Sequence, residues 1–503
     1  MDKPNNIFLF LLFILSIAAG LYVYRPQGLY FIADDFIHIP ESISNLLTQR
    51  NSLRPMGNIS LHIDYLFSGK SSLGYHLTNL LLHVVNSIFV FFLCRGLIKK
   101  YAIHDSVIWF PSLAAITFFI YPFHSESIFW IIGRSGSLGA LFFLPALILF
   151  LQRQKSIWFF LGSLVFFELA LLSYESSWIF PLLVMVISYI DMQFDNVSIK
   201  KLLPYIIMVW LLFVLTLGFR SHVTGEVFNS YDTSTILHFN IRPLALNALR
   251  LFGRTMLPPF QNTQWLIISF FVALMFIIAL IVKFYRHRQP KQLFILLTAF
   301  WLLSYLPYLS LGIDTHGTEG ERYLYLPSVF FCLWLMYVLH RIVNREFQLA
   351  FATVFLFASI LFLHQSRSYY TRAGAITKTT FDELGKLGNK QMVFVENLPQ
   401  YYRGAVIFRL GFEEGVKWLQ PSFGSQVTIL SIDSSDQNRH IVPSNNFVVD
   451  YKTSAVTRSI GSTMVKDSSF RTNYIKSAIP AIGFDLNKHA LLVYSDTVLT
   501  IIK

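Results

Sequence analysis

The chain has 503 residues, of which 54% are hydrophobic and 17% aromatic, and only 14% carry a charge. Because a soluble domain averages about 25% charged residues, this composition excludes an ordinary soluble protein and predicts a polytopic membrane protein with a more polar region attached. Much of the formal net charge of +12 lies in short turns between apolar stretches, where it sets membrane orientation. The sequence has no basic patch interleaved with aromatic residues, so it does not indicate a nucleic-acid partner.

Eleven apolar stretches, several of them short, have the composition of membrane spans, which need about 20 mostly apolar residues. They are residues 7–24, 76–98, 107–121, 137–151, 157–172, 178–190, 202–218, 265–282, 293–311, 323–339 and 347–363. Alternate turns collect the basic residues Lys3; Arg95, Lys99 and Lys100; Arg153 and Lys155; Lys200 and Lys201; Lys283, Arg286, Arg288 and Lys291; Arg341 and Arg345. This alternation predicts a cytoplasmic N-terminus, and an odd number of spans then places the C-terminal region outside the cytoplasm.

The opposite set of turns carries acids, histidines and single arginines instead of plain basic clusters. Its members are Asp34, Asp35, Arg54, His124, Glu126, Arg134, Glu175, Arg220, His316, Glu319, Glu321 and Arg322. Arginines on the outer side run against the orientation bias, so we interpret them as ligands of an anionic group. Pairing with neighbouring acids is the alternative interpretation for each of them.

Asp34 and Asp35 directly follow the first apolar stretch, where the chain leaves the bilayer. An acid at a membrane edge is costly, since a charge at a helix centre costs roughly 2.5–3.5 kcal/mol on insertion scales, and this favours a functional role. A solvated turn or a helix cap is the alternative, because Asp is common in both.

Two outer segments, residues 39–73 and 241–257, have the apolar spacing of amphipathic helices that lie along the membrane face. From about Gln365 the chain is more polar, and a helical lead-in at 370–387 precedes short alternating runs at 392–395, 405–408, 427–431, 447–451 and 490–494. We therefore predict a transmembrane domain over residues 1–364 and an extracytoplasmic α+β or mostly β domain over residues 365–503.

Several sequence blocks from the outer turns occur in a distinctive order. LRPMGN at 53–58 is followed by GYHLTNLLLHVVN at 74–86, YPFHSESIFWIIGRS at 121–135 and ERYLYLPS at 321–328. These blocks resemble those of the transmembrane and tetratricopeptide-repeat-containing O-mannosyltransferases and their bacterial relatives, which belong to the GT-C superfamily of membrane glycosyltransferases. Asp34 and Asp35 fall where GT-C enzymes place an acidic motif, in the first external loop. The helical repeats of the animal members are not visible in this sequence.

The resemblance implies an inverting glycosyltransferase, a hexosyltransferase of the cytoplasmic membrane, that moves a sugar from a polyprenyl-phosphate-linked donor to a hydroxyl of a protein or glycan acceptor on the outer face. It places the general base at Asp34, with Asp35 orienting the acceptor or exchanging roles with it. The donor phosphate is assigned to Arg322, Arg134 and Arg54, because fork-shaped guanidinium groups suit a departing phosphate.

Two alternative functions remain open. A transporter or flippase of lipid-linked glycan is disfavoured, because the charges cluster at one face and no internal symmetry is visible. The intact acidic pair and the arginines argue against a binding or assembly protein with a degenerate catalytic site.

Four further residues of the outer turns, His124, Glu126, Glu175 and Glu321, are expected to contact substrate or to support the groups that do. A divalent metal is an option, with Asp35, His124 and Glu126 as its ligands, and no other cofactor is indicated. Hydrogen-bonded supporting roles fit the two-residue spacing of His124 and Glu126 better than metal ligation.

The sequence also shows one departure from the family and one pair of histidines. The family has Ser-Lys-Glu in an outer turn where this chain has Ser173, Tyr174 and Glu175, so a cationic role at that spot is in doubt. His76 and His83 lie seven residues apart on one face of the second predicted span, and we expect core histidines bonded to neighbouring helices.

Overall fold

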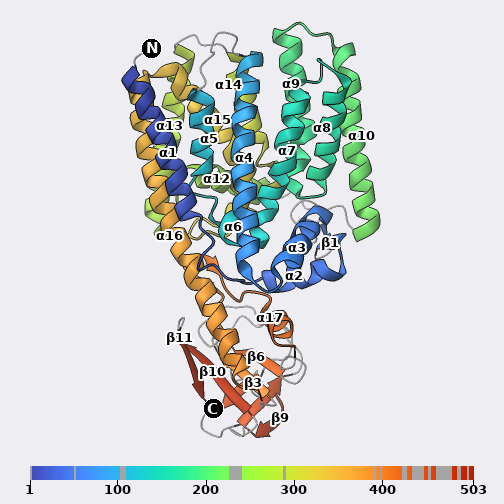
Figure 1. Cartoon of the computed structure of the whole chain (residues 1–503), viewed down its shortest axis with the longest axis vertical. Coiled ribbons are helices and arrows are strands. Elements are labelled where there is room, and N and C mark those ends of the chain that lie inside the picture. Colours follow the sequence, from blue (N-terminus) through green and yellow to red (C-terminus); the bar gives the residue numbers. More distant parts are fainter. Residues whose placement is uncertain are drawn as a thin grey trace. The chain divides into compact units, whose positions relative to one another are not determined.

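Figure 1 shows the structure of the chain, a computed structural model. It describes residues 3–49, 52–101, 109–225, 241–286, 291–388, 392–396 and 398–421 and, beyond these, six strand segments between residues 428 and 502. The chain divides into two compact units. The helical unit comprises Met1–Leu29 and Glu41–Tyr369, and the C-terminal unit comprises Tyr30–Pro40 and Tyr370–Lys503.

Each predicted apolar stretch contains a helix where the structure describes it. These helices are α1 (Lys3–Val23), α4 (Ser72–Tyr101), α5 (Trp109–Phe119), α7 (Ser135–Leu151), α8 (Ile157–Leu171), α9 (Phe180–Phe194), α10 (Ile199–Thr224), α13 (Thr263–Arg286), α14 (Lys291–Leu303), α15 (Tyr325–Ile342) and α16 (Arg345–Gly385). Helix α14 ends earlier than predicted, and the short 3-10 helix η3 (Leu306–Tyr308) that follows contains Pro307, which disfavours helical geometry in the residue before it.

Seven helical segments among the described residues are long and apolar enough to cross a membrane. They are Ser72–Tyr101, Ile132–Leu151, Glu175–Phe194, Ile199–Thr224, Thr263–Arg286, Glu321–Ile342 and Arg345–Gly385, and shorter apolar helices lie at Phe13–Val23, Phe110–Phe119 and Ile157–Leu171. The protein is therefore a multi-pass membrane protein. Its total of eleven spans and its orientation stay predictions.

Helix α15 forms the centre of the helical unit. Every residue from Tyr325 to Leu339 is buried, and α15 packs against α5, α7, α13 and α14. A helix that is apolar on all sides belongs in such a core. Helices α10 and α13 instead expose large apolar side chains such as Leu215 and Phe271, as expected of helices that face lipid, and Figure 1 shows α10 at an edge of the bundle.

A buried ion cluster ties together the ends of α4, α7 and α9. Asp191 accepts hydrogen bonds from Arg153 Nη2 at 2.7 Å and from the Tyr101 hydroxyl at 2.9 Å, and Lys100 Nζ lies 2.8 Å away. Arg153 and Asp191 are fully buried. Two residues that we predicted as turn cations thus neutralise one buried acid, which stabilises a charge that would be costly alone.

The two segments predicted as amphipathic are helical. The first contains α2 (Asp35–Ser44), a short hairpin of β1 (Thr48–Gln49) and β2 (Ser52–Leu53), and α3 (Pro55–Ser68), and the second is α12 (Ile241–Met256). Asn58 Nδ2 donates to the carbonyls of Asn45 and Thr48 at 2.8 and 2.7 Å. The last residue of the LRPMGN block therefore fixes the start of α3 against the hairpin.

The C-terminal unit contains the end of α16, the helix α17 (Phe412–Leu419) and short strands. In one sheet the order is β11 (Val498–Ile502), β10 (His489–Ser495), β3 (Met392–Glu396), β6 (Thr428–Ile432), with β3 parallel to both neighbours and β10 antiparallel to β11. The strands β4 (Tyr401–Tyr402) and β5 (Ala405–Val406) pair, as do β7 (Phe447–Asp450), β8 (Ala455–Ser459) and β9 (Ala478–Gly483). Strands β3, β5, β6, β7 and β10 lie in or beside the predicted runs, whereas α17 and the parallel pairing were not predicted.

Candidate functional site

Two sequence blocks almost 200 residues apart meet at the N-terminal end of α15. The helix α6 (Ser125–Phe129) lies in YPFHSESIFWIIGRS, and the 3-10 helix η4 (Glu321–Leu324) begins ERYLYLPS. Ser125 Oγ donates to Glu321 Oε2. Arg322 binds Glu126 twice, through its backbone N–H at 2.8 Å from Oε2 and through guanidinium Nη1 to Oε1. The blocks that the resemblance singled out therefore form one connected polar site.

His124 joins the same blocks at a second point. Its Nε2 lies 2.7 Å from Ser328 Oγ, and that hydroxyl donates its proton to the Tyr325 carbonyl at 2.8 Å. We therefore assign the imidazole proton to Nε2. Burial, and next the proximity of His83, hold the pKa of His124 well below 6.5. His124 is thus a buried neutral ring that supports the turn carrying Ser125 and Glu126.

Three polar residues on one face of α4 bind the neighbouring segments. Asn79 Nδ2 donates to the carbonyls of Ile128 and Trp130 at 3.3 and 2.9 Å, and Asn86 Nδ2 donates to Ser137 O at 2.7 Å. Spacings of three and four residues place Asn79, His83 and Asn86 on the same side of a helix. Asn79, His83 and Asn86 of the GYHLTNLLLHVVN block therefore each supply a donor to a backbone carbonyl of a neighbouring segment, as a membrane interior requires.

His83 is the core histidine that its position predicted. Its Nε2 lies 2.8 Å from Phe119 O, and its Nδ1 lies 2.8 Å from the Tyr325 hydroxyl, which also accepts from Asn86 Nδ2 at 3.1 Å. The carbonyl can only accept, so Nε2 carries the proton and the tyrosine donates to Nδ1. This chain of hydrogen bonds connects α4, α5 and α15.

Two glycines allow the close backbone contacts of the site. A Cβ on Gly133 would lie 1.9 Å from the Glu126 carbonyl oxygen, and one on Gly136 would lie 2.9 Å from the Arg322 carbonyl oxygen. Real Cβ contacts are longer than 3 Å, so both positions require glycine while the neighbouring backbone stays in place. The glycines around Arg134 therefore bring the two chain segments into contact.

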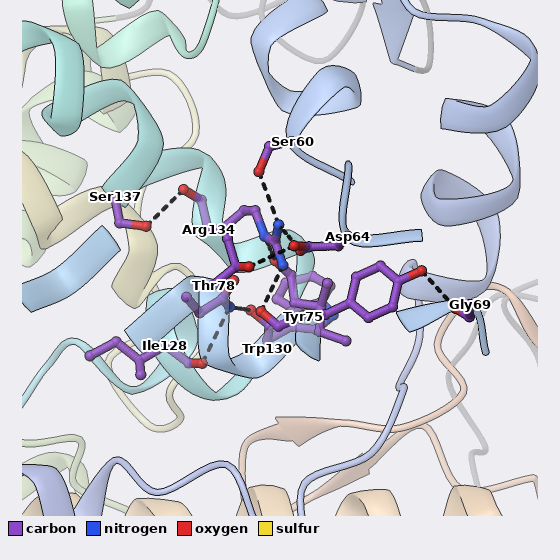
Figure 2. Close-up of polar contacts among 11 residues, drawn as sticks. Ser60, Asp64, Gly69, Tyr75, Thr78, Ile128, Trp130, Arg134 and Ser137 are labelled. Atoms are coloured by element: carbon purple, nitrogen blue, oxygen red, sulfur yellow. Dashed lines mark hydrogen bonds and ion pairs between the residues drawn. The ribbon is translucent and has the colours of Figure 1, made fainter. Parts of the chain in front are cut away.

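Arg134, predicted to bind the donor phosphate, is committed to protein groups (Figure 2). Nη1 lies 2.5 Å from Asp64 Oδ2 and 3.0 Å from Ser60 Oγ, Nη2 lies 2.8 Å from Tyr75 O, and Nε lies 3.2 Å from Ile131 O. Asp64 also accepts from Thr78 Oγ1 at 2.6 Å. All three guanidinium nitrogens of a 2% exposed side chain are therefore in use, and the arrangement ties α3, α4 and the η1 turn (Ile132–Arg134) together.

Two arginines surround Glu175, which begins the 3-10 helix η2 (Glu175–Ile179). Arg54 binds it through Nη2 at 2.7 Å and Nε at 3.3 Å, and Arg220 of α10 binds it through Nη2 at 3.0 Å. Tyr174 replaces the family's lysine, and its ring lies 5.0 Å from the Arg54 guanidinium carbon. Arg54 and Arg220 thus place positive charge beside Tyr174, the position where the family has a lysine.

Arg322 lies near Arg54 and Glu175. Burial lowers the pKa of Arg54, but the charge of Glu175 leaves that pKa raised overall, and the positive charge of Arg322 acts against the increase. The Arg322 guanidinium carbon is 4.9 Å from the Tyr323 ring and 5.3 Å from the Trp130 ring, and its side chain is 20% exposed.

The group contains the three arginines Arg54, Arg220 and Arg322 and the two glutamates Glu126 and Glu175. We call these five residues the arginine cluster.

Glu321 has a partner that the sequence interpretation missed. Arg254 Nη2 lies 2.6 Å from Glu321 Oε1, both side chains are almost fully buried, and Arg254 also donates to Asp314 O at 3.1 Å. Arg254 was predicted only as a member of an amphipathic helix. Asn247, Leu251 and Arg254 are buried residues at helical spacing on one face of α12, and that pattern was the available signal.

A metal site was an option for Asp35, His124 and Glu126. Among the described residues no group of three or more His, Cys, Asp or Glu side chains could hold a metal ion. Glu126 binds Arg322, and Asp35 Oδ2 accepts the Ile32 N–H. The residues present therefore do not fit the proposed ligand set.

The acidic pair begins α2 and belongs to the C-terminal unit. Asp35 is fully buried, and its Oδ2 accepts the Ile32 N–H at 2.9 Å. Asp34 is 8% exposed, and its carbonyl accepts the His38 N–H at 2.9 Å in the first helical hydrogen bond. Asp35 therefore closes the turn that precedes α2, while Asp34 occupies the capping position.

Three comparisons place the chain among known proteins. It is 23% identical over 296 residues to protein O-mannosyl-transferase F38B6.6 of Caenorhabditis elegans, covering 56% of this chain and 41% of that protein. It is 31% identical over 105 residues to TMTC3 of Mus musculus and 34% identical over 103 residues to tmtc2 of Xenopus laevis, which is 21% and 20% of this chain. The chain is similar to the protein O-mannosyl-transferases. The resemblance inferred from the sequence blocks is therefore confirmed.

The similarity to these relatives is partial. The chain spans 41% of the length of the Caenorhabditis elegans O-mannosyl-transferase and 10% and 11% of the other two. No family model matches the chain. Among solved structures, a crystal structure of ArnT from Cupriavidus metallidurans bound to undecaprenyl phosphate is similar with a TM-score of 0.47 and 11% identity, covering 84% of this chain and 86% of that one.

Proposed function

We propose that the protein is an inverting glycosyltransferase that uses a polyprenyl-phosphate-linked sugar and transfers it to an acceptor hydroxyl at the outer face of the cytoplasmic membrane. The similarity to the protein O-mannosyl-transferases supports the reaction class. The observation that carries the proposal is the arginine cluster, because several guanidinium forks gathered beside apolar helices suit a lipid-linked phosphate.

In this proposal Arg322 and Arg54 bind the donor phosphate, and Arg220 takes the place that we first gave to Arg134. Arg322 and Arg54 are each 20% exposed, whereas Arg134 is buried and bonded at every nitrogen. Preorganised guanidinium groups in a site of low polarity stabilise the charge that develops on a leaving phosphate. Glu126 and Glu175 hold the arginine forks in place before the donor arrives.

Asp34 acts as the general base of the proposed reaction. Its carboxylate takes the proton from the acceptor hydroxyl, the acceptor oxygen forms a bond to the anomeric carbon, and the bond from that carbon to the phosphate oxygen breaks with its electron pair leaving on the phosphate. Attack opposite to the leaving group inverts the anomeric centre. Such proton transfer contributes typically about 10²–10⁴-fold. Asp35 has a supporting role, since its carboxylate closes the turn before α2.

The decisive experiment measures sugar transfer by the purified full chain in lipid nanodiscs. Polyprenyl-phosphate mannose is the first donor because of the names of the relatives, and other polyprenyl-phosphate hexoses follow, each with serine- and threonine-containing peptides and with glycan acceptors. We expect Asp34→Asn to lose at least about 10²-fold in kcat, with Asp35→Asn losing activity together with folded-state stability. Transfer by Asp34→Asn at the wild-type rate would remove the proposed base, and chelator treatment in the same assay tests whether transfer needs a divalent metal.

A further inference from the structure

The acidic segment Tyr30–Pro40 is held by parts of the C-terminal unit that residues 41–369 separate from it in sequence. The Ala33 N–H donates to the Ile407 carbonyl at 2.8 Å, and the Ile407 N–H donates to Gln400 O at 2.8 Å. Ala33 directly precedes Asp34. This hydrogen bond therefore fixes the backbone immediately before the acidic pair.

Glycines of the C-terminal unit approach the acidic segment more closely than any side chain permits. A Cβ on Gly411 would lie 2.2 Å from the Ala33 carbonyl oxygen, and Gly411 also has φ +82°. A Cβ on Gly374 in α16 would lie 2.9 Å from the Tyr30 N atom, and one on Gly415 in α17 would lie 2.6 Å from the Phe381 ring and 3.0 Å from the Phe36 ring. Backbone at Gly374 and Gly411 therefore packs directly against the segment.

Aromatic rings anchor the residues on both sides of the acidic pair. Phe31 packs edge-on against Trp418 at a centroid distance of 5.2 Å, and Phe36 packs against Phe381 at 5.0 Å and Trp418 at 6.2 Å. Phe31 and Phe36 are fully buried. Because the anchors are five residues apart, the turn between them, which carries both carboxylates, has little freedom to move.

The turn is also strained. Ala33 has φ +45°, a left-handed conformation that a non-glycine residue adopts at a cost. Such a conformation persists only where the surroundings over-determine it, and it is often found at functional sites. Here the surroundings are Ile407, which accepts the Ala33 N–H, and Gly411, whose missing side chain leaves room for the Ala33 carbonyl.

We propose that residues 407–418 are a positioning segment for the acidic pair, so that the C-terminal unit takes part in catalysis as well as in any binding of acceptor. The proposal rests on the proposed function, in which Asp34 is the base. Its residues act through Asp34 and not on substrate. A displacement of about 1 Å in a catalytic group can cost about 10²-fold in rate, which sets the effect expected from loosening the segment.

Gly411→Ala in the full chain tests the proposal through two independent measurements. Hydrogen–deuterium exchange should show that the peptide over residues 30–36 exchanges at least about tenfold faster, because the new Cβ displaces the Ala33 carbonyl. With polyprenyl-phosphate mannose, kcat should fall by about 10²-fold, and the affinity for polyprenyl phosphate should stay within about twofold, since the arginine cluster is untouched. Gly411→Asn should behave like Gly411→Ala, because Asn tolerates φ > 0 but carries the same Cβ.

Two controls separate this effect from general damage. Gly388 lies in an exposed turn of the same unit, where a Cβ meets nothing within 4 Å. Gly388→Ala should therefore leave kcat and the hydrogen–deuterium exchange of residues 30–36 unchanged. Trp418→Ala removes a half-buried ring and provides a second test if Gly411→Ala does not fold, and Trp418→Phe should restore most of the activity because it keeps an aromatic contact with Phe31 and Phe36.

The outcomes are distinguishable. Unchanged exchange at residues 30–36 in Gly411→Ala and Trp418→Ala overturns the positioning segment. Faster exchange with a wild-type kcat overturns its role in catalysis, and full activity of Gly411→Asn shows that backbone conformation, not close approach, was the constraint. If the wild type transfers no sugar from any donor, the proposed function fails with its catalytic consequence, while the exchange result still decides whether residues 407–418 hold the acidic turn.

Discussion

Arg134 Nη1 lies 2.5 Å from Asp64 Oδ2, and the two side chains are only 2% and 8% exposed. The pair links α3 to the turn before α7, and Tyr75 O and Thr78 Oγ1 complete its hydrogen bonds from α4. A buried ion pair adds little stability over apolar packing, but removing one partner leaves a buried charge uncompensated. The arrangement therefore assigns Arg134 to the architecture of the site.

We predict that Arg134→Gln destabilises the protein by about 3–5 kcal/mol, because Asp64 then keeps a buried charge without its counter-ion. Thermal unfolding in nanodiscs measures the loss, and the double variant Arg134→Gln with Asp64→Asn should recover part of it. Lys201→Gln, at an exposed position of α10, serves as the control. A stable Arg134→Gln protein that binds polyprenyl phosphate at least tenfold more weakly would return Arg134 to the phosphate site.

Arg322→Ala is expected to weaken polyprenyl phosphate binding by about 10–10²-fold, because hydrogen bonds to charged groups contribute about 1.5–3 kcal/mol each. Arg220→Ala should weaken binding less, since Arg220 acts on the phosphate together with Arg54. Binding of polyprenyl phosphate, followed by the change in tryptophan fluorescence, measures both effects. Arg286→Ala, exposed in the last turn of α13, should bind as the wild type does, and the same affinity in Arg322→Ala would refute the assignment.

Much of the helical architecture follows from sequence because apolar stretches in a membrane protein have one stable form, a helix that satisfies its own backbone. Helices α4, α7 and α10 begin within four residues of their predicted starts. The C-terminal unit was harder, because the parallel pairing of β3 with β6 and β10 joins strands that are distant in sequence. Alternating short runs indicate strands, but they carry no information about which strands pair.

The sequence predicted which residues belong to the site, but it did not predict which acid pairs with which arginine. The sequence blocks indicated Glu126, Glu321 and Arg322 together, and the structure joins Glu126 to Arg322. The sequence did not show that Glu321 pairs with Arg254, because charge pairing across membrane helices depends on how α12 packs against α15. Sequence position also assigned Asp34 to the transmembrane domain, whereas its contacts assign it to the C-terminal unit.

Gly133→Ala should disrupt the turn that carries Glu126, because the new Cβ would lie 1.9 Å from the Glu126 carbonyl oxygen. We expect a loss of about 1–3 kcal/mol in the free energy of unfolding, as in other overpacked sites, together with weaker polyprenyl phosphate binding because Arg322 loses its fixed partner. The matched control is Gly96→Ala in α4, where a Cβ meets nothing within 4 Å. Gly96→Ala should be neutral or stabilising, and equal behaviour of the two variants would contradict the close contact.

His124 should make stability depend on pH. Burial, and next His83, hold its pKa well below 6.5 in the folded protein, whereas the unfolded chain takes up a proton near pH 6.5. The unfolded state then binds more protons, so this contribution to stability is complete above about pH 6.5 and is lost as pH falls toward the folded-state pKa, by up to about 1.4 kcal/mol per pH unit.

The groups around His124 make this dependence assignable. His83 lies at a ring distance of 5.0 Å, and the other neighbours, Tyr121, Tyr325 and Ser328, carry no charge near neutral pH. His124→Gln, which keeps a donor for Ser328 Oγ, should therefore show a smaller fall in melting temperature between pH 7.5 and pH 5.5 than the wild type. An equal fall in both proteins would mean that His124 does not stay neutral because of its burial, and the supporting role given to its ring would have to be abandoned.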